Sequence, residues 1–144
     1  HLVLVEVDIA TGVVQILKYF IADDCGTRLN PATCEGMTQG GVAQGVGAAL
    51  LEEYVYDDDG QLLTSTFMDY LLPTIYEVPM TEKRALYTPS PFTPLGAKGM
   101  GEGALHTTPA ALMCAINDAL RPLGVQAHEV PASPKRLWAL LHPE

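Results

Sequence analysis

The chain has 144 residues, 48% hydrophobic and 17% charged, a composition that excludes a disordered protein and gives one domain enough apolar material for a core. Its net charge of −9, with only eight scattered Lys and Arg residues, argues against a nucleic-acid partner, because phosphates attract basic side chains. No apolar run approaches the roughly eighteen residues of a membrane span, so we expect no such span.

The first elements in the chain form a β-hairpin pattern. Residues 2–8 and 13–22 are apolar and β-branched, with turn-forming residues between them. Because the strand pattern starts directly after His1, we expect residues 1–144 to be a single domain that is part of a longer protein.

A helix is predicted over residues 32–53, after Pro31, a residue suited to a first helical turn. Its apolar stripe, at helical spacing, consists of Val42, Val46, Ala49 and Leu50. The same segment carries Gly36, Gly40, Gly41, Gly45 and Gly47. Each interior glycine costs up to about 1 kcal/mol relative to Ala, so either another backbone or a flat ligand must approach this helix closely. Close packing against a sheet is the alternative that the pattern leaves open.

The middle of the chain is less regular. Residues 54–63 resemble a short strand pair around an Asp-rich tip, which we expect to be solvated because it lacks the ligand spacing of a calcium loop. Prolines make residues 67–79 irregular, and residues 83–87 have the composition of a strand. Three prolines in residues 88–94 then form a stiff approach to a glycine-rich run.

The last third of the chain predicts two helices and a strand. Thr108 can cap a helix that has Pro109 at its first position. The apolar stripe of that helix is Leu112, Ala115, Ile116, Ala119 and Leu120. Residues 125–130 suggest a short strand, and Ser133-Pro134 begins a terminal helix. Strands and helices interleave with at least one hairpin, which predicts an α+β fold of short strands and two or three helices.

The cysteines, Cys25, Cys34 and Cys114, are odd in number and form no C-x-x-C pair. This pattern argues against a disulfide framework or a structural zinc site, and it favours a reducing, cytoplasmic compartment. We expect all three cysteines to be buried free thiols.

The run at residues 96–103 places one carboxylate, Glu102, among four glycines. Glycine lets the main chain approach a ligand closely, so a lone acid in this run, followed by a helix pattern, indicates a positioned base. The alternative is a tight turn in which Glu102 only adds negative charge to the start of the next helix. The proline-stiffened approach and the glycine-rich helix upstream favour the site.

Several runs, taken in order, resemble the C-terminal part of the molybdenum-binding subunit of the xanthine dehydrogenase, aldehyde oxidase and carbon monoxide dehydrogenase family. The runs are DDCG at 23–26, NP at 30–31, EG at 35–36, GGVAQGVG at 40–47, LEE at 51–53, FMDYLLP at 67–73 and GAKGMGE at 96–102. One such run would be a weak signal, whereas several in sequence are specific. Bacterial carbon monoxide dehydrogenase large subunits are the members that look most similar.

The resemblance implies that Glu102 is the catalytic base in the oxidation of an aldehyde, an N-heterocycle or carbon monoxide, with water as the oxygen source. Partial desolvation makes a carboxylate a stronger base, which suits this role. The resemblance also implies that the cofactor is lined by Gly40, Gly41, Gln44, Gly45, Lys98, Gly99 and Gly101. It implies no metal ligand from this chain.

The implied cofactor is molybdenum held by a pterin, expected in the cytosine dinucleotide form, with iron–sulfur clusters and FAD on other domains or subunits. The implied partners are the remainder of the molybdenum-binding subunit, the iron–sulfur and flavin subunits, and a small-molecule substrate; a homo-oligomer stays open. We expect the isolated chain to be inactive, because the earlier half of the family's subunit supplies much of the cofactor cradle.

The chain departs from the family pattern at Met37, where many relatives carry Gln and a side-chain amide donor. This departure favours an alternative in which the domain keeps the fold as a structural or interaction module without catalysis. An unrelated nucleotide-binding enzyme is disfavoured, because the glycine run is neither a G-x-G-x-x-G nor a G-x-x-x-x-G-K-[ST] motif.

Overall fold

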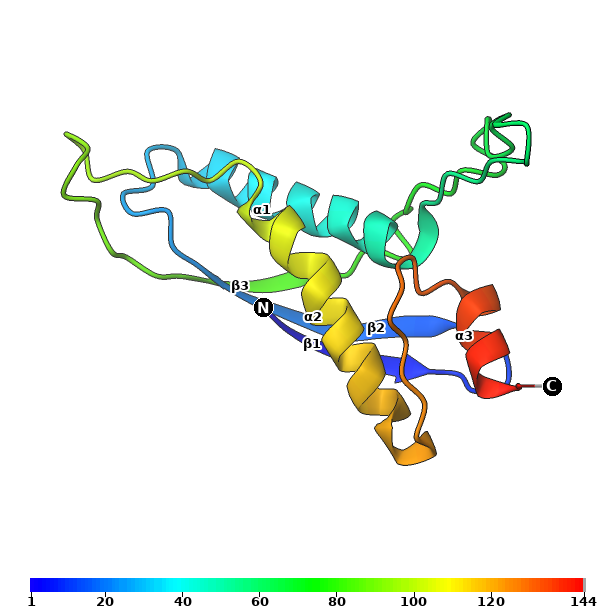
Figure 1. Ribbon diagram of the computed structural model, residues 1–144. Coiled ribbons are helices and arrows are strands. Elements are labelled where there is room, and N and C mark those ends of the chain that lie inside the picture. The colour runs from blue at the N-terminus through cyan, green and yellow to red at the C-terminus, as the bar shows by residue number, and fades with distance from the viewer. Residues whose placement is uncertain (144) are drawn as a thin grey trace.

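A three-stranded sheet forms one layer of the structure, a computed structural model that describes residues 1–143 (Figure 1). Strands β1 (Leu2–Val7) and β2 (Val14–Asp23) are antiparallel and form the predicted hairpin. Strand β3 (Thr81–Ala85) pairs parallel to β2, giving the order β1-β2-β3. The predicted strand at 83–87 is therefore confirmed, with its start two residues earlier than expected.

Helix α1 (Pro31–Val46) begins as its sequence predicts, with Pro31 in the first turn. The Asn30 side chain accepts a hydrogen bond from the Thr33 N–H at 3.2 Å, which satisfies one of the free donors of the first turn. The helix continues as a π-helical turn, η1 (Gly47–Leu51), so helical structure covers most of the predicted segment 32–53. The predicted apolar stripe is buried throughout.

Helix α2 (Gly103–Leu120) corrects the predicted start at Thr108-Pro109, because both residues lie inside it. The Thr108 hydroxyl donates to the Ala104 carbonyl at 2.7 Å instead of capping a helix end. Proline inside a helix costs about 3 kcal/mol, and the packing of the first two turns against α1 offsets that cost. The start of α2 is therefore set by its packing against α1 and not by the local capping pattern at Thr108 and Pro109.

The C-terminal segment contains a 3-10 turn, η2 (Arg121–Leu123), and the predicted terminal helix α3 (Pro134–Leu141). The predicted strand at 125–130 is wrong, because this segment joins no sheet. Its backbone pairs instead with the side chain of Asn117, which accepts from the Ala127 N–H at 2.8 Å and donates to the Ala127 carbonyl at 2.9 Å. A side-chain amide thus replaces the neighbouring strand.

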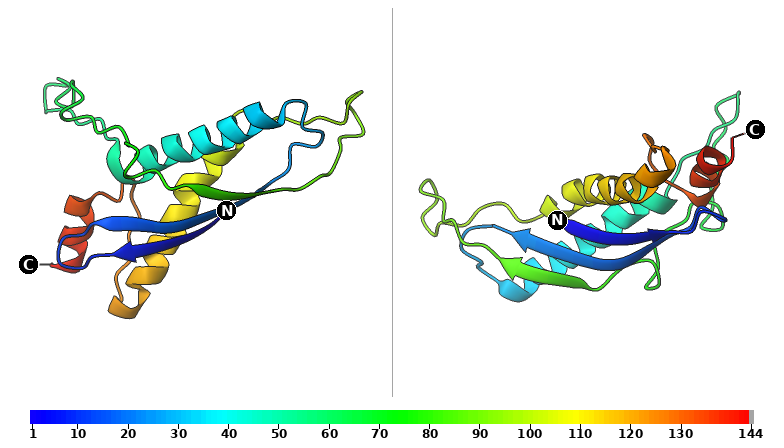
Figure 2. Two further views of the ribbon diagram at one scale, coloured as in Figure 1. Left: turned by 180° about the vertical axis from the view of Figure 1, so that it is seen from behind. Right: turned by 90° about the horizontal axis from the view of Figure 1, so that it is seen from below.

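The core lies between the sheet and the helices. Helix α2 lies across one face of the sheet and α1 packs against α2 (Figures 1 and 2). The largest fully buried aliphatic residues of the core are Val42, Val46, Leu112, Ile116, Leu120 and Leu137. Cys25 and Cys34 are buried free thiols as predicted, but Cys114 is exposed on α2, so that part of the prediction is wrong. The fold is α+β, as expected.

Part of the segment between η1 and β3 projects from the body as an extended arm, and the end of the segment returns to the body, where the Pro79 carbonyl accepts from the Gln39 side chain (Figure 2). The predicted strand pair at 54–63 is reduced to one antiparallel bridge between Tyr56 and Leu62. Residues 67–79 form turns without regular structure, as predicted. None of the helices within residues 1–143 is both long enough and apolar enough to cross a membrane.

Candidate functional site

Two glycines of α1 form the contact with the first turns of α2. A Cβ added at Gly41 would lie 3.0 Å from the Ala104 Cβ and 3.0 Å from the Leu105 N. A Cβ added at Gly45 would lie 2.5 Å from the Thr108 Cβ, closer than real atoms approach. The predicted close approach to this helix is therefore made, at these two positions, by another helix.

The other two cofactor candidates of α1 are open. Gly40 and Gln44 are exposed, and a Cβ added at Gly40 would meet nothing within 4 Å. Each precedes by one residue a glycine that touches α2, so both lie beside the α1–α2 crossing. Of the four candidates on α1, these two are accessible to a ligand, whereas Gly41 and Gly45 are buried.

The crossing is tied to the sheet by a buried hydroxyl pair. Tyr19 on β2, which is 1% exposed, donates from its hydroxyl to the Thr108 Oγ1 at 3.0 Å. Burial raises the pKa of Tyr19, so its phenol stays protonated and keeps donating. The Tyr19 oxygen also lies 2.9 Å from the His1 Nδ1. These contacts set where α2 begins relative to the sheet.

The glycine run starts in a tight backbone pairing with the segment after β2. Gly26 and Gly96 both have left-handed backbones, with φ of +63° and +69°, and an antiparallel bridge joins Gly26 to Ala97. A Cβ at Gly26 would collide with the Gly96 carbonyl oxygen. That carbonyl accepts hydrogen bonds from the backbone of Thr27 at 3.2 Å and Ser90 at 3.0 Å. Glycine at both positions permits this close pairing.

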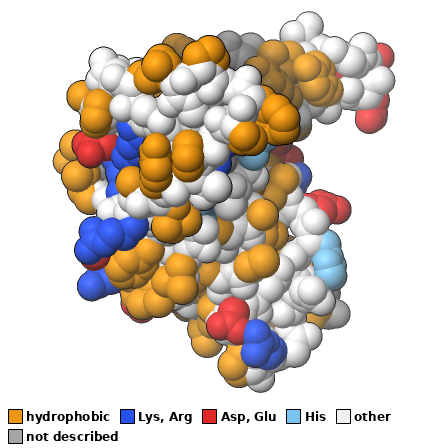
Figure 3. All heavy atoms as spheres, turned by 90° about the vertical axis from the view of Figure 1, so that its left-hand side faces the viewer, with side chains coloured by type: hydrophobic (Ala, Val, Ile, Leu, Met, Phe, Trp, Pro, Cys, Tyr) orange, Lys and Arg blue, Asp and Glu red, His pale blue; other side chains and the backbone are white. Residues whose placement is uncertain are grey.

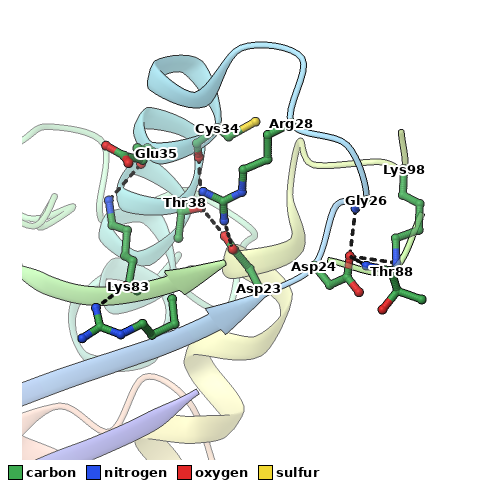
Figure 4. Close-up of polar contacts among 11 residues, drawn as sticks. Asp23, Asp24, Gly26, Arg28, Cys34, Glu35, Thr38, Lys83, Thr88 and Lys98 are labelled. Atoms are coloured by element: carbon green, nitrogen blue, oxygen red, sulfur yellow. Dashed lines mark hydrogen bonds and ion pairs between the residues drawn. The ribbon is translucent and has the colours of Figure 1, made fainter. Parts of the chain in front are cut away.

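Asp24 fastens the same run by its side chain (Figure 4). Its Oδ1 accepts from the Thr88 N–H at 3.2 Å and the Gly26 N–H at 2.8 Å, and it pairs with the Lys98 Nζ at 3.0 Å. Hydrogen bonds from Thr88 and Gly26, together with the Lys98 charge, hold the pKa of Asp24 well below its usual range. The ionised carboxylate therefore joins three segments of the chain.

Asp23 makes the corresponding contacts with α1 and with the segment before it. Its Oδ2 accepts from the Thr38 hydroxyl at 2.9 Å, and its Oδ1 pairs with the Arg28 guanidinium (Figure 4). Asp23 is the last residue of β2 and Asp24 is the first residue after it, and the two carboxylates bind different segments of the chain. Sequence analysis did not assign Asp23 or Asp24 to the site; the available signal was a pair of carboxylates at a strand end.

Glu102 sits immediately before the first residue of α2. Its side chain is exposed and makes no capping hydrogen bond, while its carbonyl accepts from the His106 N–H at 3.2 Å. Gly99 and Gly101, on the approach to Glu102, have nothing within 4 Å of an added Cβ. A cavity of about 260 Å³ lies between Gly99 and the first turns of α2, where Gly103 also lines it.

The donors at this place suit a phosphate-bearing organic cofactor. The first N–H groups of a helix have no partners within the helix, and α2 has no side-chain cap to satisfy them. Such N–H groups bind phosphates without Lys or Arg. Gln44 is exposed on α1, and the backbone at Gly40, Gly99 and Gly101 is open, with nothing within 4 Å of a Cβ added at each glycine. Within residues 1–143, no group of three or more His, Cys, Asp and Glu side chains is placed to hold a metal ion.

A family model described as the molybdopterin cofactor-binding domain matches residues 1–79. The chain belongs to this family. It is 44% identical over 137 residues to the nicotine 6-hydroxylase large subunit of Paenarthrobacter nicotinovorans, covering 95% of this chain and 17% of that protein. It is 38% identical to the carbon monoxide dehydrogenase large chain of Hydrogenophaga pseudoflava, covering 98% of this chain and 18% of that one.

The fold agrees with this assignment. The crystal structure of quinoline 2-oxidoreductase from Pseudomonas putida 86 superposes with a TM-score of 0.92 and 48% sequence identity. The match covers 95% of this chain and 17% of the quinoline 2-oxidoreductase chain. The predicted resemblance is therefore confirmed. We expected the greatest similarity to carbon monoxide dehydrogenase, but the sequence identity to the nicotine hydroxylase is higher, at 44% against 38%. The chain spans less than a fifth of the length of these relatives.

Proposed function

We propose that this chain is the part of a molybdenum hydroxylase that carries the catalytic base, and that the enzyme hydroxylates a carbon of an N-heteroaromatic substrate with water as the oxygen source. The observation that carries the proposal is the position of Glu102, exposed at the end of an open glycine run and directly before α2. Family membership and relatives named for nicotine and quinoline support the reaction and the substrate class.

In this proposal Glu102 takes a proton through a carboxylate oxygen. The anchored first half of the run, with Lys98 tied to Asp24, holds the backbone on one side of Glu102, and α2 holds it on the other. Its side chain is free of hydrogen bonds to the described residues, so it is available to a reacting group. Covering by the rest of the subunit would remove water and strengthen it as a base.

The cofactor in this proposal is a molybdenum-pterin in the cytosine dinucleotide form. When bound, it supplies the two-electron oxidation chemistry of the hydroxylation. Gly40, Gln44, Gly99 and Gly101 line it with open backbone or an exposed amide, and Lys98 fixes the run beside it. The N-terminus of α2 provides N–H groups for its phosphates. Gly41 and Gly45 contribute indirectly, by holding α1 against α2.

The partners in this proposal are the remainder of the subunit and the iron–sulfur and flavin subunits that remove electrons, in a reducing, cytoplasmic compartment. Large apolar side chains on the arm and the loop before the glycine run are almost fully exposed: Phe67, Met68, Ile75, Tyr76 and Phe92. Hydrophobic side chains also spread over the face in Figure 3. Apolar surface of this extent marks an interaction site, which suits coverage by the rest of the enzyme.

The test is Glu102→Gln in the assembled enzyme, with Glu129→Gln, another exposed acid, as the control. We expect turnover of an N-heterocycle, followed with a dye acceptor, to fall by about 10²–10⁴-fold, because general-base catalysis contributes that much. Molybdenum content should stay unchanged. Retention of more than about a tenth of the rate would show that Glu102 is not an essential base.

The same dye assay, run with heterocycles, aldehydes and carbon monoxide, tests the substrate class. We expect N-heterocycles to be turned over. Activity with carbon monoxide alone would show that the proposed N-heteroaromatic substrate class is wrong. The isolated chain should show no turnover and no stoichiometric molybdenum, since it spans only 17% of its relative.

The second candidate is a structural or interaction module without catalysis, which Met37 favours. This residue is 42% exposed on α1 and offers a thioether where the family resemblance implies an amide donor. Elemental analysis of the assembled protein separates the two candidates. Molybdenum near one atom per subunit supports the enzyme, and its absence from an intact assembly supports the module.

A further inference from the structure

Four sulfur-bearing side chains line a single cavity beside the glycine run. The cavity has a volume of about 220 Å³ and lies between the segment after β2, the first turns of α1 and the run itself. Its sulfur-bearing residues are Cys25, Cys34, Met37 and Met100. The chain has only three Cys and five Met in total, so half of its sulfur atoms belong to residues that line this one space.

The two thiols are held there by the backbone contacts of the site. The Cys25 carbonyl accepts from the Lys98 N–H at 2.8 Å, and the Cys34 carbonyl accepts from the Thr38 hydroxyl at 3.0 Å. Cys25 is 2% exposed and Cys34 9% exposed, and both are free. Figure 4 shows the Cys34 sulfur turned away from α1 toward the segment that carries Arg28.

Positive charge lies at the same place. Lys98 lines the cavity and pairs with Asp24, and Arg28 lies on the segment between the two cysteines and pairs with Asp23. The Arg28 Nε is buried and has no hydrogen-bond partner among residues 1–143. A buried donor without a partner is costly, and an anionic sulfur ligand close to it would reduce that cost.

We propose that Cys25 and Cys34 bind one soft monovalent cation of the Cu(I) class through two thiolates, with the Met37 and Met100 thioethers as further donors. Thiolate and thioether sulfur are the ligands that Cu(I) prefers over harder metal ions. Binding releases the two S–H protons and transfers no electron. Two thiolates and one cation leave one negative charge, which lies close to the Lys98 side chain although Lys98 also pairs with Asp24.

This site uses only residues of this chain, and the Cu(I) measurement does not use turnover by the enzyme as its readout. The test measures how much Cu(I) the assembled protein withdraws from its bicinchoninate complex, compared with Cys34→Ser. We expect the wild-type protein to bind one more equivalent per chain than Cys34→Ser. The control Cys114→Ser, which removes the exposed thiol on α2, should bind as much as the wild type. Equal Cu(I) binding by wild type and Cys34→Ser would overturn the proposal.

A second variant keeps both thiols in case Cys34→Ser fails to assemble. Met37→Leu combined with Met100→Leu preserves the volume and removes the thioether donors. We expect its affinity for Cu(I) to fall by about tenfold or more, the range seen when metal sites lose supporting groups. An unchanged affinity in the double variant would show that the methionines are not ligands, and that no four-sulfur site exists.

Discussion

The glycines of α1 at the helix crossing and the glycines before α2 serve opposite purposes. At Gly45 there is no room for a methyl group, because a Cβ would lie 2.5 Å from that of Thr108. At Gly99 and Gly101 an added Cβ would meet nothing within 4 Å. In the first region the missing side chain lets two helices touch, and in the second it leaves backbone open to a molecule outside the chain.

The comparison shows that a glycine-rich segment is not by itself a ligand site. Gly41 and Gly45 lie one position after Gly40 and Gln44, yet the first pair is buried and the second exposed. Neighbours along a helix point about 100° apart, so one helix can pack on a partner and present an open face beside the contact. The cofactor candidates are accordingly the exposed positions.

The largest stability effect is expected for Gly45→Ala. Overpacking of a filled contact costs about 1–3 kcal/mol, and here the added methyl would collide with Thr108. The midpoint of urea unfolding should fall accordingly. Gly36→Ala, also within α1 but open, is the matched control. Equal midpoints for the two variants would mean that the helices do not touch at Gly45.

Tyr19→Phe tests the buried hydroxyl pair beneath the crossing. Loss of the hydrogen bond to Thr108 should cost about 0.5–1.5 kcal/mol, since the partner oxygen stays buried without that donor. The measurement is the same unfolding midpoint, with the exposed Tyr56→Phe as its control. A cost no larger than that of the control would remove this pair from the contacts that position α2.

Asp24→Asn tests the anchoring of the open run. Proteolysis within the loop between β3 and α2 should become faster at neutral pH, whereas Asp58→Asn at the exposed hairpin tip should change nothing there. Hydrogen bonds from Thr88 and Gly26 hold the folded pKa of Asp24 below 3.8, the ordinary value for an aspartate, so its contribution to stability is present above that pH and is lost as pH falls below it. A variant that differs from wild type only below pH 3.8 would contradict this sign.

The smallest effects on stability are expected for Gly36→Ala and Gly40→Ala. Each should stabilise α1 by up to about 1 kcal/mol, because alanine is the better helix former and the added Cβ meets no neighbour. If Gly40 faces the cofactor, Gly40→Ala should also lower the molybdenum content of the assembled enzyme, and Gly36→Ala should not. Full molybdenum content in Gly40→Ala would remove Gly40 from the cofactor residues.

Elements with a strong local pattern could be predicted from the sequence. The hairpin follows from β-branched runs, and α1 follows from Pro31 and a stripe at helical spacing that is buried as expected. The failures share one cause. The start of α2 and the state of residues 125–130 depend on partners far along the chain, namely α1 for the first and Asn117 for the second.

The candidate site divides in the same way. Glu102 and its glycine run can be recognised from the sequence because they form one motif of consecutive residues. The roles of Asp23 and Asp24 are not, since Lys98 and Thr38 meet them only in the fold.

The sequence by itself thus determined the family, the α+β class and the run that carries Glu102, because each rests on residues close together in the chain. Only the tertiary structure decided which glycines pack and which stay open, where α2 begins, and that four sulfur-bearing residues share one cavity. These features depend on contacts between segments that are far apart in the chain, and such contacts cannot be predicted from local sequence patterns.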